Sequence, residues 1–109
     1  MTIYRKRAKK MTIYLDDGTK FQGKPVHKVL LNLFMEKKIA GATLFKGAAG
    51  YGGDMKMHSA SVLRLTEDLP MKIEVVDAAE KIDSVLDEVS KIAEKGFIDV
   101  ADTEIICRS

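Results

Sequence analysis

Met71-Lys72-Ile73-Glu74-Val75-Val76-Asp77-Ala78-Ala79-Glu80 is the stretch in which a strand leads directly into a helix. Met71 to Val76 is rich in β-branched residues, which predicts a central strand. Asp77 and Glu80 have the spacing of a helix N-cap with a capping box. The chain then carries an apolar stripe at helical spacing, at Ile82, Val85, Leu86, Val89, Ile92 and Ala93, and Gly96 follows as a helix stop. The sequence therefore predicts a strand–helix unit over residues 71–96.

A similar unit precedes it. Met11 to Asp16 alternates apolar and polar residues, which indicates a strand. Pro25 suits the first position of a helix whose apolar stripe is Val26, Val29, Leu30, Leu33 and Phe34, and Gly41 ends it. Further strands are expected at 42–46, 59–65 and 103–107, and Phe97 is expected to pack under the second helix. The order β-α-β-β-α-β predicts an α+β, ferredoxin-like sandwich, an antiparallel sheet with two helices on one face.

The other face of this sheet is predicted to be open. We expect it to include Thr12, Tyr14, Leu44 and Val76, which are too apolar to remain in water comfortably. An apolar open face favours self-association as a dimer or trimer.

The basic charge of the chain is concentrated at its start. The net charge is +2, but residues 1–10 hold five cations and no acid, so the remainder carries 2 − 5 = −3. We therefore divide the chain into a basic N-terminal extension, 1–10, and a domain, 11–109. The extension is expected to be a solvated tail; the alternatives are a strand prolonged outward and a contact with nucleic acid or an anionic surface. A basic nucleic-acid-binding face is not supported for the domain.

Composition narrows the class of protein. No apolar run of membrane-spanning length and no secretory signal are visible in the 109 residues, so a cytoplasmic protein without a membrane span is expected. Cys107 is the single cysteine and there are two histidines, so neither an internal disulfide nor a zinc cluster is expected.

The segment from Lys46 to Ser59 is the candidate site. It contains Gly47, Gly50, Gly52 and Gly53, and four glycines in seven positions are costly to order. Such a loop can expose backbone N–H groups to an anion. The alternative is a flexible connection without a ligand, because the segment lacks the ending of a nucleotide P-loop and does not open a helix.

Three motifs in order resemble a known family. They are Gly41-Ala42-Thr43-Leu44-Phe45-Lys46-Gly47-Ala48-Ala49-Gly50-Tyr51-Gly52, then Met57-His58-Ser59-Ala60-Ser61, then Glu67-Asp68-Leu69-Pro70-Met71-Lys72-Ile73-Glu74-Val75-Val76-Asp77. Together they resemble the uncharacterised family numbered 190 among domains of unknown function, over about residues 11–108. Its members are similar to PII signalling proteins, which are trimers that bind adenine nucleotides in clefts between subunits.

The resemblance implies a non-enzymatic, trimeric sensor whose loop 47–59 also docks a partner protein. The implied ligand contacts are Lys46, Gly47, Gly50, Tyr51, Gly52, Lys56 and His58. PII proteins have a second phosphate loop rich in Gly and Lys, whereas residues 95–102 here include Asp99 and Asp102. A less charged nucleotide such as AMP is therefore favoured over ATP.

Two other functions remain open from the residues. One is an enzyme that uses His58 as acid/base, with Asp54 or Glu67 as its partner. The other is an RNA-contacting module of ferredoxin-like fold, which would stack bases on Tyr14 and Phe45. Nucleic acid binding is the less favoured of these, since aromatic residues are few.

Overall fold

The protein is built on one four-stranded sheet covered by two helices. The computed structural model describes residues 1–59 and 68–109. The main elements are β1 (Ile3–Asp16), α1 (Val26–Glu36), β4 (Gly41–Lys46), β7 (Pro70–Ala78), α2 (Ala79–Ile92) and β8 (Phe97–Arg108). Two short two-stranded sheets lie outside the main sheet: β2 (Lys20–Phe21) pairs with β3 (Lys24–Pro25), and β5 (Ala49–Gly50) pairs with β6 (His58–Ser59).

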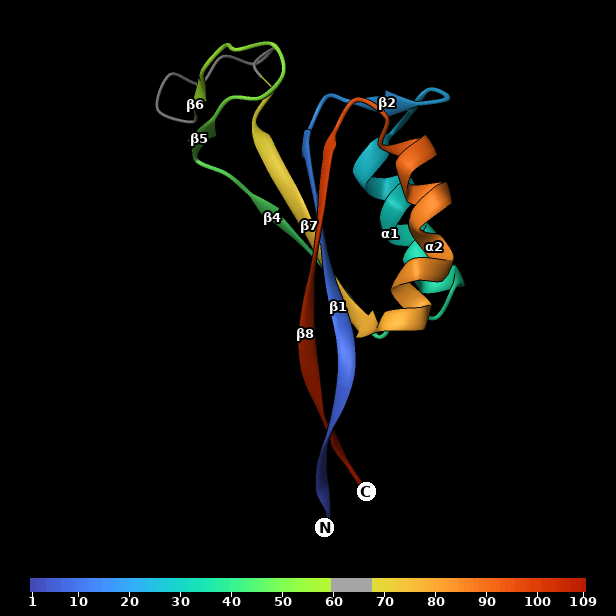
Figure 1. Ribbon diagram of the computed structural model, residues 1–109. Coiled ribbons are helices and arrows are strands. Elements are labelled where there is room, and N and C mark those ends of the chain that lie inside the picture. The colour runs from blue at the N-terminus through green and yellow to red at the C-terminus, as the bar shows by residue number, and fades with distance from the viewer. Residues whose placement is uncertain (60–67) are drawn as a thin grey trace.

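The sheet has the order β4-β7-β1-β8, and every neighbouring pair is antiparallel. Both helices lie on one face of it, as Figure 1 shows. The predicted βαββαβ ferredoxin-like order is therefore confirmed. Neither helix in the described part of the chain has the length and hydropathy needed to cross a bilayer.

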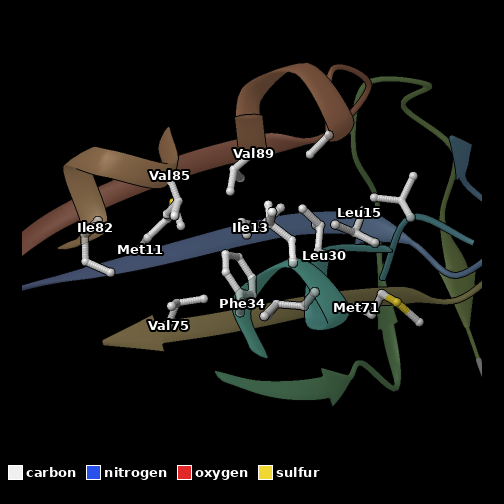
Figure 2. Packing of buried hydrophobic residues seen from close by; sticks show 14 residues of the cluster. Met11, Ile13, Leu15, Leu30, Phe34, Met71, Val75, Ile82, Val85 and Val89 are labelled. Atoms are coloured by element: carbon white, nitrogen blue, oxygen red, sulfur yellow. The ribbon is translucent and has the colours of Figure 1, made fainter. Parts of the chain in front are cut away.

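The core lies between the sheet and the helices. On β1, alternate residues Met11, Ile13 and Leu15 face the helices and pair with Val75, Ile73 and Met71 of β7. Leu30 and Phe34 from α1 and Ile82, Val85 and Val89 from α2 close over them (Figure 2). Fully burying one such side chain stabilises the fold by roughly 1.5–3 kcal/mol, so this alternation decides which face of the sheet meets the helices.

The first and last strands of the chain, β1 and β8, are longer than predicted. β1 begins at Ile3 and pairs with β8 from Ile3 opposite Arg108 to Tyr14 opposite Phe97. Residues 3–10 are therefore not the expected solvated tail; the prolonged-strand alternative holds. β8 likewise begins at Phe97 instead of Thr103. The strand expected at 59–65 lies mostly outside the described residues.

The helix ends also differ from the prediction. The N-cap of α2 is Ala78, without a side-chain cap, so the capping box at Asp77 is wrong. The Asp77 carboxylate instead accepts N–H bonds from Ala78 (2.6 Å) and Ala40 (2.8 Å) and so ties the end of β7 to the segment before β4. α1 ends at Glu36, before Gly41. Lys38, just beyond the helix, has a left-handed φ of 57°, and the Lys81 ammonium donates a hydrogen bond to its carbonyl at 2.8 Å.

The open face of the sheet carries aromatic residues. Phe45, Lys72, Tyr14 and Phe97 stand opposite one another in one row across all four strands. The expectation for Leu44 was wrong: it pairs with Ile73 and packs against the core on the helix side. Phe97 was expected under α2, but it is 65% exposed and shares the face of Tyr14.

Candidate functional site

Two adjoining hollows lie where the aromatic row meets the glycine loop. The first, of about 220 Å³, is lined by Tyr14, Phe45, Lys46, Gly47, Ala49, Pro70, Met71 and Lys72. The second, of about 320 Å³, is lined by Tyr14, Leu15, Asp16, Tyr51, Gly52, Gly53, Pro70, Met71, Lys95, Gly96 and Phe97. Tyr14, Pro70 and Met71 line both, so the two hollows are neighbours that share these residues.

Aromatic side chains line both hollows. The Tyr14 and Phe97 ring centroids are 6.1 Å apart with planes at 51°, a tilted aromatic pair. Phe45 lies in the same row as Tyr14, on the far side of Lys72, and is 44% exposed. Tyr51 reaches the second hollow from the glycine loop. These flat apolar surfaces can stack on a planar heterocycle.

Three lysines contribute positive charge, but only two are available to a ligand. The Lys72 ammonium is 3.1 Å from a Glu74 carboxylate oxygen and 5.2 Å from the centre of the Phe45 ring. This contact, with a second one from Lys10, lowers the pKa of Glu74. Lys46 and Lys95 are exposed, and no described residue forms an ion pair with either. Among the described lining residues, Lys46 is therefore available to a ligand in the first hollow and Lys95 to a ligand in the second.

The glycine loop touches the sheet closely near Pro70. The Gly47 N–H donates to the Pro70 carbonyl at 2.8 Å, so it does not face a ligand. A Cβ at Gly47 would lie 3.0 Å from Pro70 Cγ, and one at Gly50 would lie 3.2 Å from the same atom. Small residues are needed here because the loop lies directly on the proline ring. Gly47 and Gly50 therefore shape the site without supplying the N–H contacts that were expected of Gly47.

His58 and Asp54 close the loop on itself. His58 Nε2 lies 3.0 Å from Asp54 Oδ2, and the Lys56 N–H donates to Asp54 Oδ1 at 2.9 Å. These contacts, the Lys56 N–H first, lower the pKa of Asp54. β5 pairs with β6 across the same loop, Gly50 opposite His58. The loop is thus a small hairpin closed by the Asp54–His58 hydrogen bond.

Asp16 adds a carboxyl group to the second hollow. Burial raises its pKa, and the neighbouring carboxylates of Asp54, Asp68 and Asp17 act in the same sense, while His58 opposes them. This end of the site therefore disfavours additional negative charge.

The structure brings together four of the seven predicted contacts. Lys46, Gly47, Tyr51 and Gly52 line the hollows, and Gly50 lies on Pro70 beside them. Lys56 and His58 belong to the hairpin tip and line neither hollow. Glu67, the other proposed partner of His58, lies outside the described residues.

Sequence reasoning missed several lining residues. Lys72, Pro70, Phe97 and Lys95 were not named as ligand contacts, and Tyr14 and Phe45 entered only as possible RNA contacts. The alternation in each strand places Phe45, Tyr14 and Phe97 on one face, but their alignment depends on strand order and register, which no single strand reveals. No group of three His, Cys, Asp or Glu residues in 1–59 and 68–109 is arranged as metal ligands.

The fold is that of PII-like α+β proteins. The structure resembles CPII, a nitrogen regulatory PII-like protein of Thiomonas intermedia K12 bound to ADP, AMP and bicarbonate, with a TM-score of 0.69 at 19% identity over 95% of this chain and 91% of that one. At this identity the likeness establishes the fold.

The chain belongs to the DUF190 family, described as "Uncharacterized ACR", whose pattern it matches over residues 8–105. It is 34% identical to a UPF0166 protein of Aquifex aeolicus over 100 residues, 92% of this chain and 94% of that protein. It is also 34% identical to a UPF0166 protein of Methanocaldococcus jannaschii over 100 residues, 91% of this chain and 92% of that protein.

Proposed function

We propose that this protein is a PII-like, trimeric signalling protein that binds an adenine nucleotide of low charge, such as AMP, without turning it over. The observation that carries the proposal is the pair of neighbouring hollows between the aromatic row and the glycine loop, with Lys46 lining the first and Lys95 lining the second. A PII-like neighbour of the same fold has been solved with ADP and AMP.

The chemistry of the lining fits a nucleoside monophosphate. Tyr14, Phe97 and Tyr51 offer rings on which a purine can stack, and base–aromatic stacking contributes about 1–3 kcal/mol per base. A phosphate would be held by Lys46 or Lys95. Because Lys72 is already paired with Glu74, Lys46 and Lys95 are the cations without an ion pair among the described lining residues, too few to neutralise a triphosphate.

The charge of the neighbourhood also limits the number of phosphates. Asp16 lines the second hollow, and its raised pKa shows that negative charge is already unfavourable there. Each additional phosphate would bring more negative charge to the hollow that holds Asp16.

The loop 47–59 provides the signalling element. Among the described residues, it contacts the sheet through the Gly47 N–H bond to Pro70 and the packing of Gly47 and Gly50 on the Pro70 ring. A ligand in the hollows touches both the loop and the sheet, so binding would stabilise one loop arrangement. We propose that this arrangement presents or hides residues 47–59 to a partner protein.

Titration calorimetry with AMP, ADP, ATP and cyclic AMP tests the proposal, on wild type and two variants. Gly50→Val forces a branched side chain onto Pro70 and is expected to weaken AMP binding while the fold is kept. Gly41→Val is the matched control, since a Cβ at Gly41 meets nothing within 4 Å and Gly41 lines neither hollow. Equal AMP affinity in wild type and Gly50→Val would remove the glycine loop from the site.

The Asp54–His58 pair supports a second candidate function, a small enzyme with His58 as acid/base. The 3.0 Å contact gives the imidazole the carboxylate partner that such a role uses. Incubating the protein with each nucleotide and assaying for products tests it. Turnover that is lost in His58→Ala would establish catalysis; the sensor proposal expects the nucleotides to be recovered unchanged.

A further inference from the structure

A groove of about 310 Å³ lies on the helix side of the protein. Its walls are α1, the end of α2 and the hairpin formed by β2 and β3. Figure 1 shows β2 beside the start of α1 and the end of α2. None of the residues that line this groove lines either hollow of the candidate site. The groove is therefore a separate concavity, and the proposed function does not use it.

The floor of the groove is apolar and fixed by the core. Phe21 of β2, Val29 and Leu33 of α1, and Ile92 of α2 line it. Leu33 belongs to the buried core, and Phe21 and Ile92 pack against that core. Ligand pockets usually combine such an apolar lining with a few polar groups, and a volume near the lower end of their range suits a small ligand.

Four polar residues line the same groove. Gln22 and Lys24 come from the hairpin, and Asn32 and Glu36 come from α1, where a spacing of four places them on one face. All four are exposed. Within residues 1–59 and 68–109, neither Lys24 nor Glu36 forms an ion pair. One unpaired cation and one unpaired anion therefore line one groove, together with two amide side chains.

Two of these polar residues are in positions that do not favour the fold. Glu36 is the last residue of α1, and the last turn of this helix holds no basic residue. A negative charge at a helix C-terminus is unfavourable because of the helix dipole. Gln22 has a left-handed φ of 51°, which a residue with a side chain rarely adopts. Real proteins break such local rules mostly at functional or strained sites, and both of these residues line the groove.

A small zwitterion with an apolar side chain matches this lining. Its carboxylate would accept a hydrogen bond from the Lys24 ammonium, and its own ammonium would donate to the Glu36 carboxylate. The amides of Gln22 and Asn32 can both donate and accept, so they can bond to either ionic group. The apolar side chain would cover the floor of the groove. A nucleotide is the weaker match, because a single cation faces an anion in the same groove.

We propose that this groove binds a free α-amino acid with an apolar side chain. The proposal adds a second small ligand to the protein, at a site apart from the nucleotide hollows, and it does not depend on the proposed function.

Nuclear magnetic resonance of nitrogen-15-labelled protein tests the proposal with L-leucine as the probe. Saturable shifts of the backbone amides of Gln22, Asn32 and Glu36 are expected. Three analogues each lack one feature: 4-methylpentanoate lacks the ammonium, 3-methylbutylamine lacks the carboxylate, and glycine lacks the apolar side chain. Each should bind more weakly than leucine, by about two- to fivefold where one exposed charge pair is lost.

Two variants assign the charges. Glu36→Gln and Lys24→Gln keep the size of the side chain and remove its charge, so each should raise the dissociation constant of leucine by about two- to fivefold. Glu36→Gln should also remove the preference for leucine over 4-methylpentanoate, because the ammonium then has no anion to meet. Glu94→Gln and Lys28→Gln are the matched controls, since both residues are exposed and neither lines the groove. Circular dichroism checks the fold of each variant.

Several results would overturn the proposal. These are no saturable shift with leucine, equal binding of leucine and 4-methylpentanoate, or an unchanged dissociation constant in both groove variants. N-acetyl-leucinamide bound as tightly as leucine would assign the groove to a peptide segment of a partner protein instead. Leucine binding without AMP binding in calorimetry would retain the groove site and remove the proposed function, and AMP binding without leucine binding would do the opposite.

Discussion

Gly96 lies at the turn from α2 into β8 and forms part of the wall of the second hollow. A Cβ at this position would lie 2.6 Å from the Tyr14 carbonyl oxygen and 3.3 Å from that of Ala93. Both are backbone atoms, and Tyr14 is held in the sheet by pairing with Phe97 and Lys72. Gly96→Ala therefore cannot be relieved by rotating a side chain.

The loss of stability expected for Gly96→Ala is the balance of two opposing effects. Overpacking of this kind destabilises by about 1–3 kcal/mol. Replacing Gly with Ala also restricts the unfolded chain, which stabilises by about 0.4–1 kcal/mol. The net loss for Gly96→Ala then lies between about 0 and 2.6 kcal/mol, toward the upper end because the 2.6 Å approach is to a backbone atom, and in a domain of this size each 1 kcal/mol lowers Tm by about 4–8 °C.

Differential scanning calorimetry of Gly96→Ala and Gly53→Ala isolates the contact. Gly53 also lines the second hollow, but a Cβ there meets nothing within 4 Å. Gly53→Ala is therefore expected to keep or slightly raise Tm, while Gly96→Ala lowers it. If Gly96→Ala were as stable as wild type, or if the two variants lost equal stability, the close approach to Tyr14 would not govern this turn.

Two further predictions concern pH. Burial and nearby carboxylates raise the pKa of Asp16 above its ordinary 3.8, so its contribution to stability is full below that value and is lost as pH rises through the folded-state pKa. Asp16→Asn should therefore have a higher Tm than wild type at pH 7, and the difference should shrink below about pH 4; an unchanged difference would exclude titration of Asp16 as its cause. Burial, with Lys28 and Lys46, lowers the pKa of His27 from 6.5, and its Nδ1 has no hydrogen-bond partner among the described residues. The contribution of neutral His27 to stability is thus full above pH 6.5 and is lost as pH falls through the folded-state pKa. The Tm of His27→Gln should therefore fall less than that of wild type between about pH 7 and pH 5. Parallel profiles of Tm against pH would contradict this.

The sequence predicted the parts of the fold that depend on local periodicity. The stripes of α1 and α2 and the alternation of Met11, Ile13 and Leu15 each show one buried face, and these elements formed as expected. Helix ends were less predictable, because Asp77 bonds to Ala40, a contact made by the folded chain. Leu44 was placed on the wrong face because its register against Ile73 is set by strand pairing.

Dependence on strand pairing also limited the prediction of the site. A cluster of glycines in the sequence identified the loop, and Lys46, Tyr51 and Gly52 do line the hollows. Their partners Tyr14, Lys72 and Phe97 come from three other strands, and register alone brings them together. The extent of β1 was missed because its first residues are rich in charge, and pairing with β8 outweighs that local signal.

Binding of AMP at the hollows is the central claim, and calorimetric titration of AMP into protein of known oligomeric state tests it most directly. The expected result is a micromolar dissociation constant with one site per chain. ATP should bind more weakly, since Lys46 and Lys95 are the only cations without an ion pair among the described lining residues. No heat from AMP, ADP, ATP or cyclic AMP with a folded, assembled protein would contradict the claim and leave the PII likeness as a likeness of fold.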